Sequence, residues 1–311
     1  RRVLWYSVAM SFVHLHTHSH YSFLQALPKI DELVGAAKKN NMTALALTDA
    51  GNLHGAIEFY KQAKKKDLKP IIGVDAYLAP KSRFDRDRDE KRSRILLLAE
   101  NMQGYTNLLT LVTKSFTEGF FERPRIDREL LKEHHHGLIA ILPSFSGDVA
   151  KRIGSGDTIG AGAVLAEYVS LFGKDNVFLE ITHHPSVAGH EKRMEGIIAL
   201  SKESGIPVVA QHDVYYLKSE DAAACSVLRR IQQGERGYNE EEDFSFVTEE
   251  QIRTWFAHVP SAVGESGRIA ERCTVELSLG SWVFPDFKVP EGKTHADMLR
   301  ETTYAGIAMR G

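Results

Sequence analysis

Residues 44–75 read ALALTDAGNLHGAIEFYKQAKKKDLKPIIGVD, and this stretch decides the fold. The apolar runs at 44–48 and 70–74 are typical of buried strands. Between them, apolar residues recur with the spacing of one face of a helix. Asn52 is predicted to cap that helix, because its short polar side chain can accept a hydrogen bond from the first turn. Apolar strands joined by a helix are typical of parallel pairs covered on both faces, so the stretch predicts an α/β fold.

The same alternation runs along most of the chain. Further strands are predicted at 12–18, 95–99, 138–142, 177–181 and 206–210. About seven strands separated by amphipathic helices predict a largely parallel sheet. Polar side chains follow successive strands, and we expect them to meet at one rim of a closed barrel, whereas an open sheet would spread them in a line. These side chains are His16, His18, Asp49, Asp75, Ser144, His183, His184 and Asp213.

The pattern changes after about residue 239. Helical segments are predicted from Thr248, which with Gln251 makes a capping box, to about Cys273. Residues 284–292 are predicted to be a linker, and a further helix is predicted from Thr294. The chain therefore has a mostly helical C-terminal extension.

Three histidines, His14, His16 and His18, alternate on the first predicted strand. Side chains two apart in a strand project to one side, and imidazole is a good ligand for zinc, manganese or iron. A metal centre at the end of a strand would supply a hydroxide nucleophile near neutral pH. The alternative is a tag or a solvated edge, against which the interleaved apolar residues argue, because a tag would be contiguous.

Composition narrows the class of protein. The chain has 311 residues, 43% of them hydrophobic, a formal net charge of -2 and two cysteines, Cys225 and Cys273. This predicts a globular, reduced, cytoplasmic protein with no disulfide framework and no membrane span. The run KSRFDRDRDEKRSR at 81–94 holds seven basic and four acidic residues. It is either a solvated loop of alternating charge or an edge that contacts DNA phosphates.

Eight stretches, taken together and in order, resemble the polymerase-and-histidinol-phosphatase (PHP) domain at the N-terminus of the bacterial DNA polymerase III alpha subunit. They are FVHLHTHSHYS, ALALTDAGNLHGAIEFYKQAKK, KPIIGVDAYLAP, LLLAENMQGYTNLLTLVTKSF, PRIDRELL, FLEI, IPVVAQHDVYYL and ERCTVELSLG. They span nearly everything from Met10 onward, and their combination is far more specific than alternating histidines alone. The resemblance implies a distorted (βα)7 TIM-like barrel of the PHP type.

The resemblance also implies a site. In family members with an intact site, nine residues bind three metal ions that hydrolyse phosphoesters. Four positions match here, namely His16, His18, Asp75 (where glutamate is usual) and Asp213. The expected ligand is replaced at the other five, which are Gln25, Ala50, Arg94, Ser144 and Tyr215. Alanine cannot coordinate a metal and arginine adds positive charge, so we expect a degenerate site that binds zinc or manganese partially or not at all.

Other side chains near these positions could rebuild a smaller metal site, although a role without metal is the simpler interpretation of each. They are His14, His20, Asp49, His183, His184 and His212. The run His134–His136 is predicted instead to end a helix, where cationic imidazoles favour the helix dipole. No catalytic residue and no DNA-binding residue is assigned.

The resemblance further implies how the chain is organised. Residues 1–10 would be an upstream extension without a role, 11–285 the PHP domain, and 286–311 a linker and the truncated start of a polymerase palm region. Magnesium is expected only for the polymerase domain that this chain lacks.

Three functions follow from these expectations. The first is the N-terminal PHP region of a replicative DNA polymerase, structural or docking in role, with DNA, a proofreading exonuclease subunit and a sliding clamp as partners of the full-length protein. The second is an active metal-dependent 3′-5′ exonuclease or phosphoesterase. The third is a free-standing enzyme of the histidinol phosphatase kind. None of them involves a membrane.

Overall fold

The computed structural model describes residues 11–87, 92–233, 242–282 and 285–310, so the predicted upstream extension 1–10 lies outside it. The chain divides into two compact units, Arg1–Glu276 and Leu277–Gly311. The strands are β1 (Ala44–Leu47), β2 (Lys69–Leu78), β3 (Ser93–Ala99), β4 (Phe120–Phe121), β5 (Arg123–Ile126), β6 (Leu138–Leu142), β7 (Val177–Ile181) and β8 (Val208–Ala210). The helices of the first unit are α1 (Ile30–Lys39), α2 (Ala56–Lys65), α3 (Met102–Thr117), α4 (Arg128–Glu133), α5 (Asp148–Gly154), α6 (Thr158–Phe172), α7 (His190–Ser204), α8 (Ala222–Gln233), α9 (Glu249–Trp255) and α10 (Pro260–Arg272), with short 3-10 turns at Lys174–Asn176 and Ser219–Asp221.

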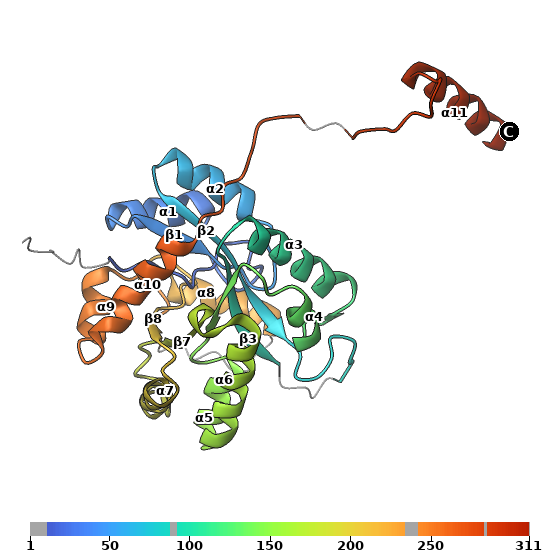
Figure 1. Cartoon of the computed structure of the whole chain (residues 1–311). Helices are drawn as coiled ribbons and strands as arrows, with labels where there is room; N and C mark the ends of the chain where they lie inside the picture. The colour runs from blue at the N-terminus through green and yellow to red at the C-terminus, as the bar shows by residue number, and fades with distance from the viewer. Residues whose placement is uncertain (1–10, 88–91, 234–241, 283–284, 311) are drawn as a thin grey trace, which may run out of the picture. The chain divides into compact units, whose positions relative to one another are not determined.

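The strands of the first unit close into a barrel with helices around it (Figure 1). The sheet runs β1, β2, β3, β6, β7, β8, and the extended residues 12–18 join its two ends. On one side the Ala46 amide donates to the His14 carbonyl at 2.9 Å. On the other side the Val214 amide donates to the His16 carbonyl at 3.0 Å. Seven extended segments therefore complete the ring, which confirms the distorted (βα)7 TIM-like barrel.

The barrel sheet is largely parallel, as expected, but it contains one reversed strand, β3. β3 pairs antiparallel with both β2 and β6, whereas β6, β7 and β8 are parallel to one another. In the described residues between β2 and β3 there is no helix, since the charged run follows β2 directly, and antiparallel neighbours need no long crossover. Because β3 runs in the opposite direction, its first residues lie at the rim where the other strands end.

Residues 12–18 are not a regular strand, although a strand was predicted there. Only Thr17 forms a β-bridge, to Val214, because side chains satisfy several of the neighbouring backbone groups. The Leu15 amide donates to Gln211 Oε1 at 2.8 Å, and the Val13 amide donates to Ser266 Oγ at 3.0 Å. The segment is nonetheless buried, as the interleaved apolar residues indicate.

Helix α10 packs against the barrel core. Ile269 and Ala270 of α10 and Cys273, directly after it, share one buried cluster with Val13 and Leu15 and with inward residues of the strands. Each fully buried aliphatic side chain of such a cluster contributes about 1.5–3 kcal/mol. Both cysteines are free and buried, as expected of packing residues.

Helix starts and ends follow the sequence signals unevenly. Thr248 caps α9 and forms the predicted capping box with Gln251. Asn52 does not cap α2, which begins at Ala56 after Gly55; its Oδ1 instead accepts from the His54 amide in the preceding turn. A short polar side chain suits a turn as well as a cap, so the prediction placed the helix start too early.

The second unit contains α11 (His295–Arg310), which matches the helix predicted from Thr294. Thr294 Oγ1 accepts a hydrogen bond from the Asp297 amide at 3.2 Å, so Thr294 caps the helix as its sequence indicates. The domain boundary at residue 285 stays a prediction. In the described part of the chain no helix has the length and apolar character needed to cross a membrane.

Candidate functional site

The predicted site residues meet at one rim of the barrel. His16 and His18 come from residues 12–18, the closing segment of the barrel. Ser144 follows β6, and Asp213 follows β8. Asp75 does not end its strand as predicted, since β2 continues to Leu78 after leaving β1. Its side chain still faces the histidines, so the convergence expected at the ends of the strands is present.

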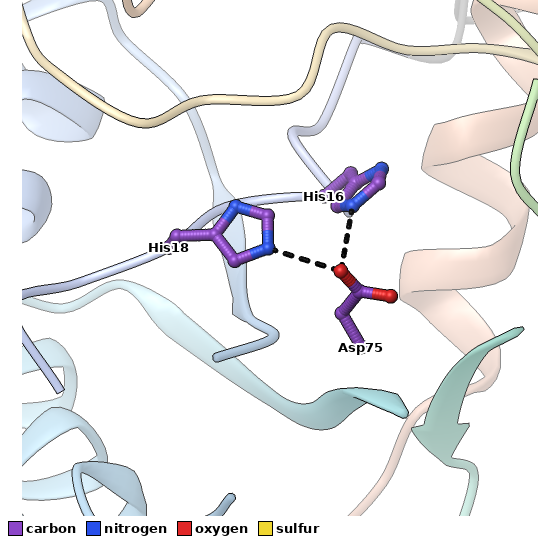
Figure 2. Close-up of side chains that lie close together, drawn as sticks. All are labelled: His16, His18 and Asp75. Carbon is purple, nitrogen blue, oxygen red and sulfur yellow. Dashed lines mark hydrogen bonds and ion pairs between the residues drawn. The ribbon is translucent and has the colours of Figure 1, made fainter. Parts of the chain in front are cut away.

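His16, His18 and Asp75 form the centre of the site (Figure 2). Both imidazoles point at one oxygen, Asp75 Oδ2, with His18 Nε2 at 3.3 Å and His16 Nε2 at 3.7 Å. One ligand atom from each residue lies within 4.8 Å of the others, and all three residues are buried. Within the described residues this is the only group of three or more such side chains with that spacing. Taken alone, the group could hold one metal ion.

A fourth side chain, Arg94, occupies that position. Its Nη1 donates to Asp75 Oδ2, the oxygen that both histidines face. Burial would raise the pKa of Asp75, but the positive charge of Arg94, with hydrogen bonds from the two histidines, holds it well below its usual range. The guanidinium thus supplies the positive charge that a metal ion would bring, and it would repel a cation placed beside it.

The replaced ligand positions surround this ion pair. Gln25 Oε1 accepts from Arg94 Nη2 at 3.3 Å, and the guanidinium carbon lies 4.4 Å from the centre of the Tyr77 ring. Tyr215 stacks on His18 with ring centres 4.2 Å apart and planes 7° apart. Ala50 forms a bridge to Asp75. The replacing side chains therefore pack around the ion pair where the family has a metal cluster. The residues present do not fit three metal ions.

The protonated state of His16 also opposes metal binding at this site. Burial would lower the pKa of His16, but Glu180 and Asp75 outweigh it and raise that pKa well above its usual value. An imidazolium has no lone pair with which to bind a metal. Burial lowers the pKa of His18 to about 4, so His18 is neutral. Its single N–H can serve either the Val214 carbonyl at 3.1 Å or Asp75, but not both at once.

Glu180 is the functional residue that the sequence reasoning missed. It lies in β7, is 2% exposed, and accepts a 2.7 Å hydrogen bond from His16 Nδ1. Its other oxygen accepts from the Ser144 amide at 2.9 Å and the Ser144 hydroxyl at 3.3 Å. The available signal was a carboxylate inside an otherwise apolar strand, because a charge is almost never buried there without a partner.

Asp213 lines the same cavity as His16 but pairs elsewhere. Its Oδ1 accepts from His184 Nε2 at 2.8 Å, and His184 Nδ1 lies 3.4 Å from Glu242 Oε1. Burial would lower the pKa of His184, yet Asp213 and Glu242 raise it to about 9. The protonated His184 thus neutralises Asp213, the fourth predicted metal ligand. The metal roles of His16, His18, Asp75 and Asp213 stay predictions.

Asp49 and His183, two of the other candidates, have structural partners. Asp49 accepts from the Ser19 amide at 2.7 Å and the Ser22 hydroxyl at 2.6 Å, and so holds the turn after the closing segment. His183 stacks on Trp255, with ring centres 4.6 Å apart. His134 is the residue after the last turn of α4, as predicted for the histidine run.

His14 contacts the Val247 carbonyl and makes a separate pH-dependent contribution to stability. Its Nε2 lies 2.9 Å from the Val247 carbonyl, and burial lowers its pKa from 6.5 to about 4. The unfolded chain takes up this proton first, so the contribution is complete above pH 6.5 and is lost as the pH falls toward 4. At 1.36 kcal/mol per pKa unit, the loss is about 3 kcal/mol.

His14→Gln should therefore make stability less dependent on pH. The glutamine amide can still donate to the Val247 carbonyl but does not titrate. Urea unfolding at pH 7, 5.5 and 4.5 would measure the slope of unfolding free energy against pH for both proteins. Equal slopes would show that His14 is not buried in its neutral form.

The described charged residues of the run at 81–94 form hydrogen bonds and ion pairs with other residues of the chain. Asp127 accepts from both the backbone amide and the guanidinium of Arg83, at 2.8 Å and 3.0 Å. Arg86 donates to the Arg83 and Glu118 carbonyls, and Arg92 pairs with Glu122 at 2.8 Å. These contacts favour the interpretation as a loop of alternating charge over the interpretation as an edge that contacts DNA phosphates.

Comparison with known proteins shows the family of the chain. The family model of the PHP domain matches residues 14–184. The chain belongs to the PHP domain family. The chain is 36% identical over 310 residues to the DNA polymerase III subunit alpha of Borreliella burgdorferi, covering 96% of this chain and 27% of that protein. It is 37% identical over 322 residues to the one from Thermus aquaticus, covering 97% and 26%.

The chain thus spans about a quarter of the length of these relatives. Among solved structures, it is similar to a proposed metal-dependent phosphoesterase from Bifidobacterium adolescentis, with 11% identity and a TM-score of 0.41, covering 78% of this chain and 95% of that one.

Proposed function

We propose that this PHP domain is a non-catalytic region of a replicative DNA polymerase, in which internal cations hold the barrel rim in place of metal ions. The observation that carries the proposal is the ion pair between Arg94 and Asp75. It neutralises the central carboxylate of the site, and the charged forms of His16 and His184 likewise neutralise Glu180 and Asp213. Such a network stabilises the rim but holds no activated water.

The relatives support the polymerase context. Their length beyond this chain would contain the nucleotidyltransferase site and its magnesium, and DNA would be bound by the full-length protein. The role of this domain would be to brace the polymerase or dock another replicase subunit, such as a proofreading exonuclease or the sliding clamp. The same proposal places the protein in the cytoplasm, where its two buried thiols would stay reduced.

Elemental analysis and a nuclease assay test the proposal together. Protein purified without chelator should contain far less than stoichiometric zinc, manganese or iron, because Arg94 occupies the ligand side of Asp75. It should also leave the 3′ end of single-stranded DNA intact when manganese or zinc is added. Metal-dependent degradation that His16→Ala abolishes would refute a non-catalytic role.

The second candidate is an active metal-dependent 3′-5′ exonuclease. It is favoured only by the spacing of His16, His18 and Asp75, whose ligand atoms could hold one ion if Arg94 moved away. That ion would supply a hydroxide nucleophile. A free-standing histidinol phosphatase finds no comparable support, since the relatives named above are polymerase subunits.

A further inference from the structure

A cavity opens beside Arg94 at the rim of the barrel. Its inner part, about 380 Å³, reaches His16, Glu180 and Asp213, and its outer part, about 650 Å³, reaches Arg92 and Glu122. The two parts adjoin, because Tyr77, Arg94, Arg123, Ser146 and Gln232 line both. This volume is ample for a small ligand of several heavy atoms.

Four arginines line the cavity, and aromatic rings or hydrogen bonds hold them in place. Arg94 is fixed by Asp75 and Gln25, as described above. Arg229 Nε donates to the Gln25 carbonyl at 3.3 Å, and its guanidinium carbon lies 4.0 Å from the Tyr215 ring centre. Arg92 pairs with Glu122, while its Nη1 is buried without a hydrogen-bond partner. These guanidinium groups are therefore preorganised, which lowers the entropic cost of binding a ligand.

Arg123 gives the described lining of the cavity an excess of positive charge. It begins β5, is partly exposed, and lies 5.9 Å from the Tyr77 ring centre. Of the described carboxylates, none forms an ion pair with it. The carboxylates that line the cavity already have cationic partners: Glu122 has Arg92, Glu180 has His16 and Asp213 has His184. Among the described residues that line the cavity, an anion therefore meets guanidinium groups more than carboxylates without a cationic partner.

We infer that this cavity binds the phosphate group of a small ligand directly through Arg123, Arg94 and Arg229, without a metal ion and without hydrolysing it. Several guanidinium groups that line one cavity suit a doubly charged oxyanion with three or four oxygens better than a carboxylate. The inference rests on the proposed function, since it requires Arg94 in the place of metal. The phosphate group could belong to a free anion or to the end of a nucleotide strand.

Isothermal titration calorimetry with inorganic phosphate and methylenediphosphonate, in buffer free of divalent cations, tests the inference. We expect saturable binding of both probes that is at least tenfold weaker in Arg123→Gln. Arg268→Gln, an exposed arginine on α10, removes the same charge far from the cavity lining and should bind like the parent protein. Arg123 is partly exposed, so its replacement should fold normally, and a thermal melt would verify this.

Oligonucleotides with and without a terminal phosphate distinguish the two sources of the group. Tighter binding of the phosphorylated strand than of inorganic phosphate would assign a strand end, and the reverse would assign a free anion. Absence of saturable binding, equal loss in Arg268→Gln, or equally tight binding of acetate would each overturn the inference.

The outcomes also separate this inference from the proposed function. Stoichiometric metal in a protein that still binds phosphate through Arg123 in chelator would contradict the proposed function alone. Binding that is indifferent to Arg123→Gln in a metal-free protein would contradict the inference alone. Phosphate binding that requires added manganese would contradict both.

Discussion

Arg94→Ala is expected to destabilise the protein strongly in the absence of metal, and zinc or manganese should restore much of the loss. Asp75 is 0% exposed and its carboxylate depends on Arg94 for neutralisation. Leaving one member of a buried ion pair without its partner costs about 3–5 kcal/mol. Removal of the guanidinium also uncovers the Asp75 oxygen that His16 and His18 face, so one metal ion could take its place.

Urea unfolding with chelator and with added zinc would measure both effects. An ion that binds only the folded state stabilises it by about 2.7 kcal/mol at a concentration of 100 times its dissociation constant. The double variant Arg94→Ala, His16→Ala should lose this rescue, and Arg268→Ala serves as a control for a surface arginine. If zinc stabilises the parent protein as much as Arg94→Ala, the guanidinium does not occupy the metal position.

Arg125→Met is expected to have the second largest effect, a loss of about 3–5 kcal/mol in the free energy of unfolding. Arg125 is 0% exposed, and its guanidinium donates to the carbonyls of Gly119, Arg83 and Asp85. Methionine has a similar length but no donors, so buried carbonyls would lose their hydrogen bonds, each at about 1–3 kcal/mol. The hydrogen bonds from Arg125 to the Arg83 and Asp85 carbonyls fix the loop that follows β2.

Chemical unfolding combined with limited proteolysis would check this prediction. The expected result is a lower urea midpoint, together with new cleavage between residues 81 and 94. Arg125→Lys should be nearly as unstable, because one ammonium group cannot reach the acceptors of a planar guanidinium. A midpoint that matches the parent protein would mean that these carbonyls find other donors.

Local patterns were sufficient to predict most elements of the barrel. The apolar positions of α1, Ile30, Leu33, Val34 and Ala37, are all buried as their helical spacing indicates. The reversal of β3 was not predictable in this way, because a buried strand has the same apolar pattern in either direction. The closing segment 12–18 likewise departs from a regular strand because residues far along the chain, Gln211 and Ser266, bond its backbone.

By itself, the sequence determined which side chains could gather at the rim, since strand ends in an α/β barrel meet on one face. It also showed which ligand positions carry a different residue. Only the tertiary structure decided what those substitutions do. Arg94 reaches Asp75 because β3 runs antiparallel to its neighbours, and Glu180 stabilises the protonated form of His16 because β7 carries it beneath the same rim. Electrostatic energy in a buried site depends on distances of a few ångströms between residues remote in sequence, and the fold alone sets those distances.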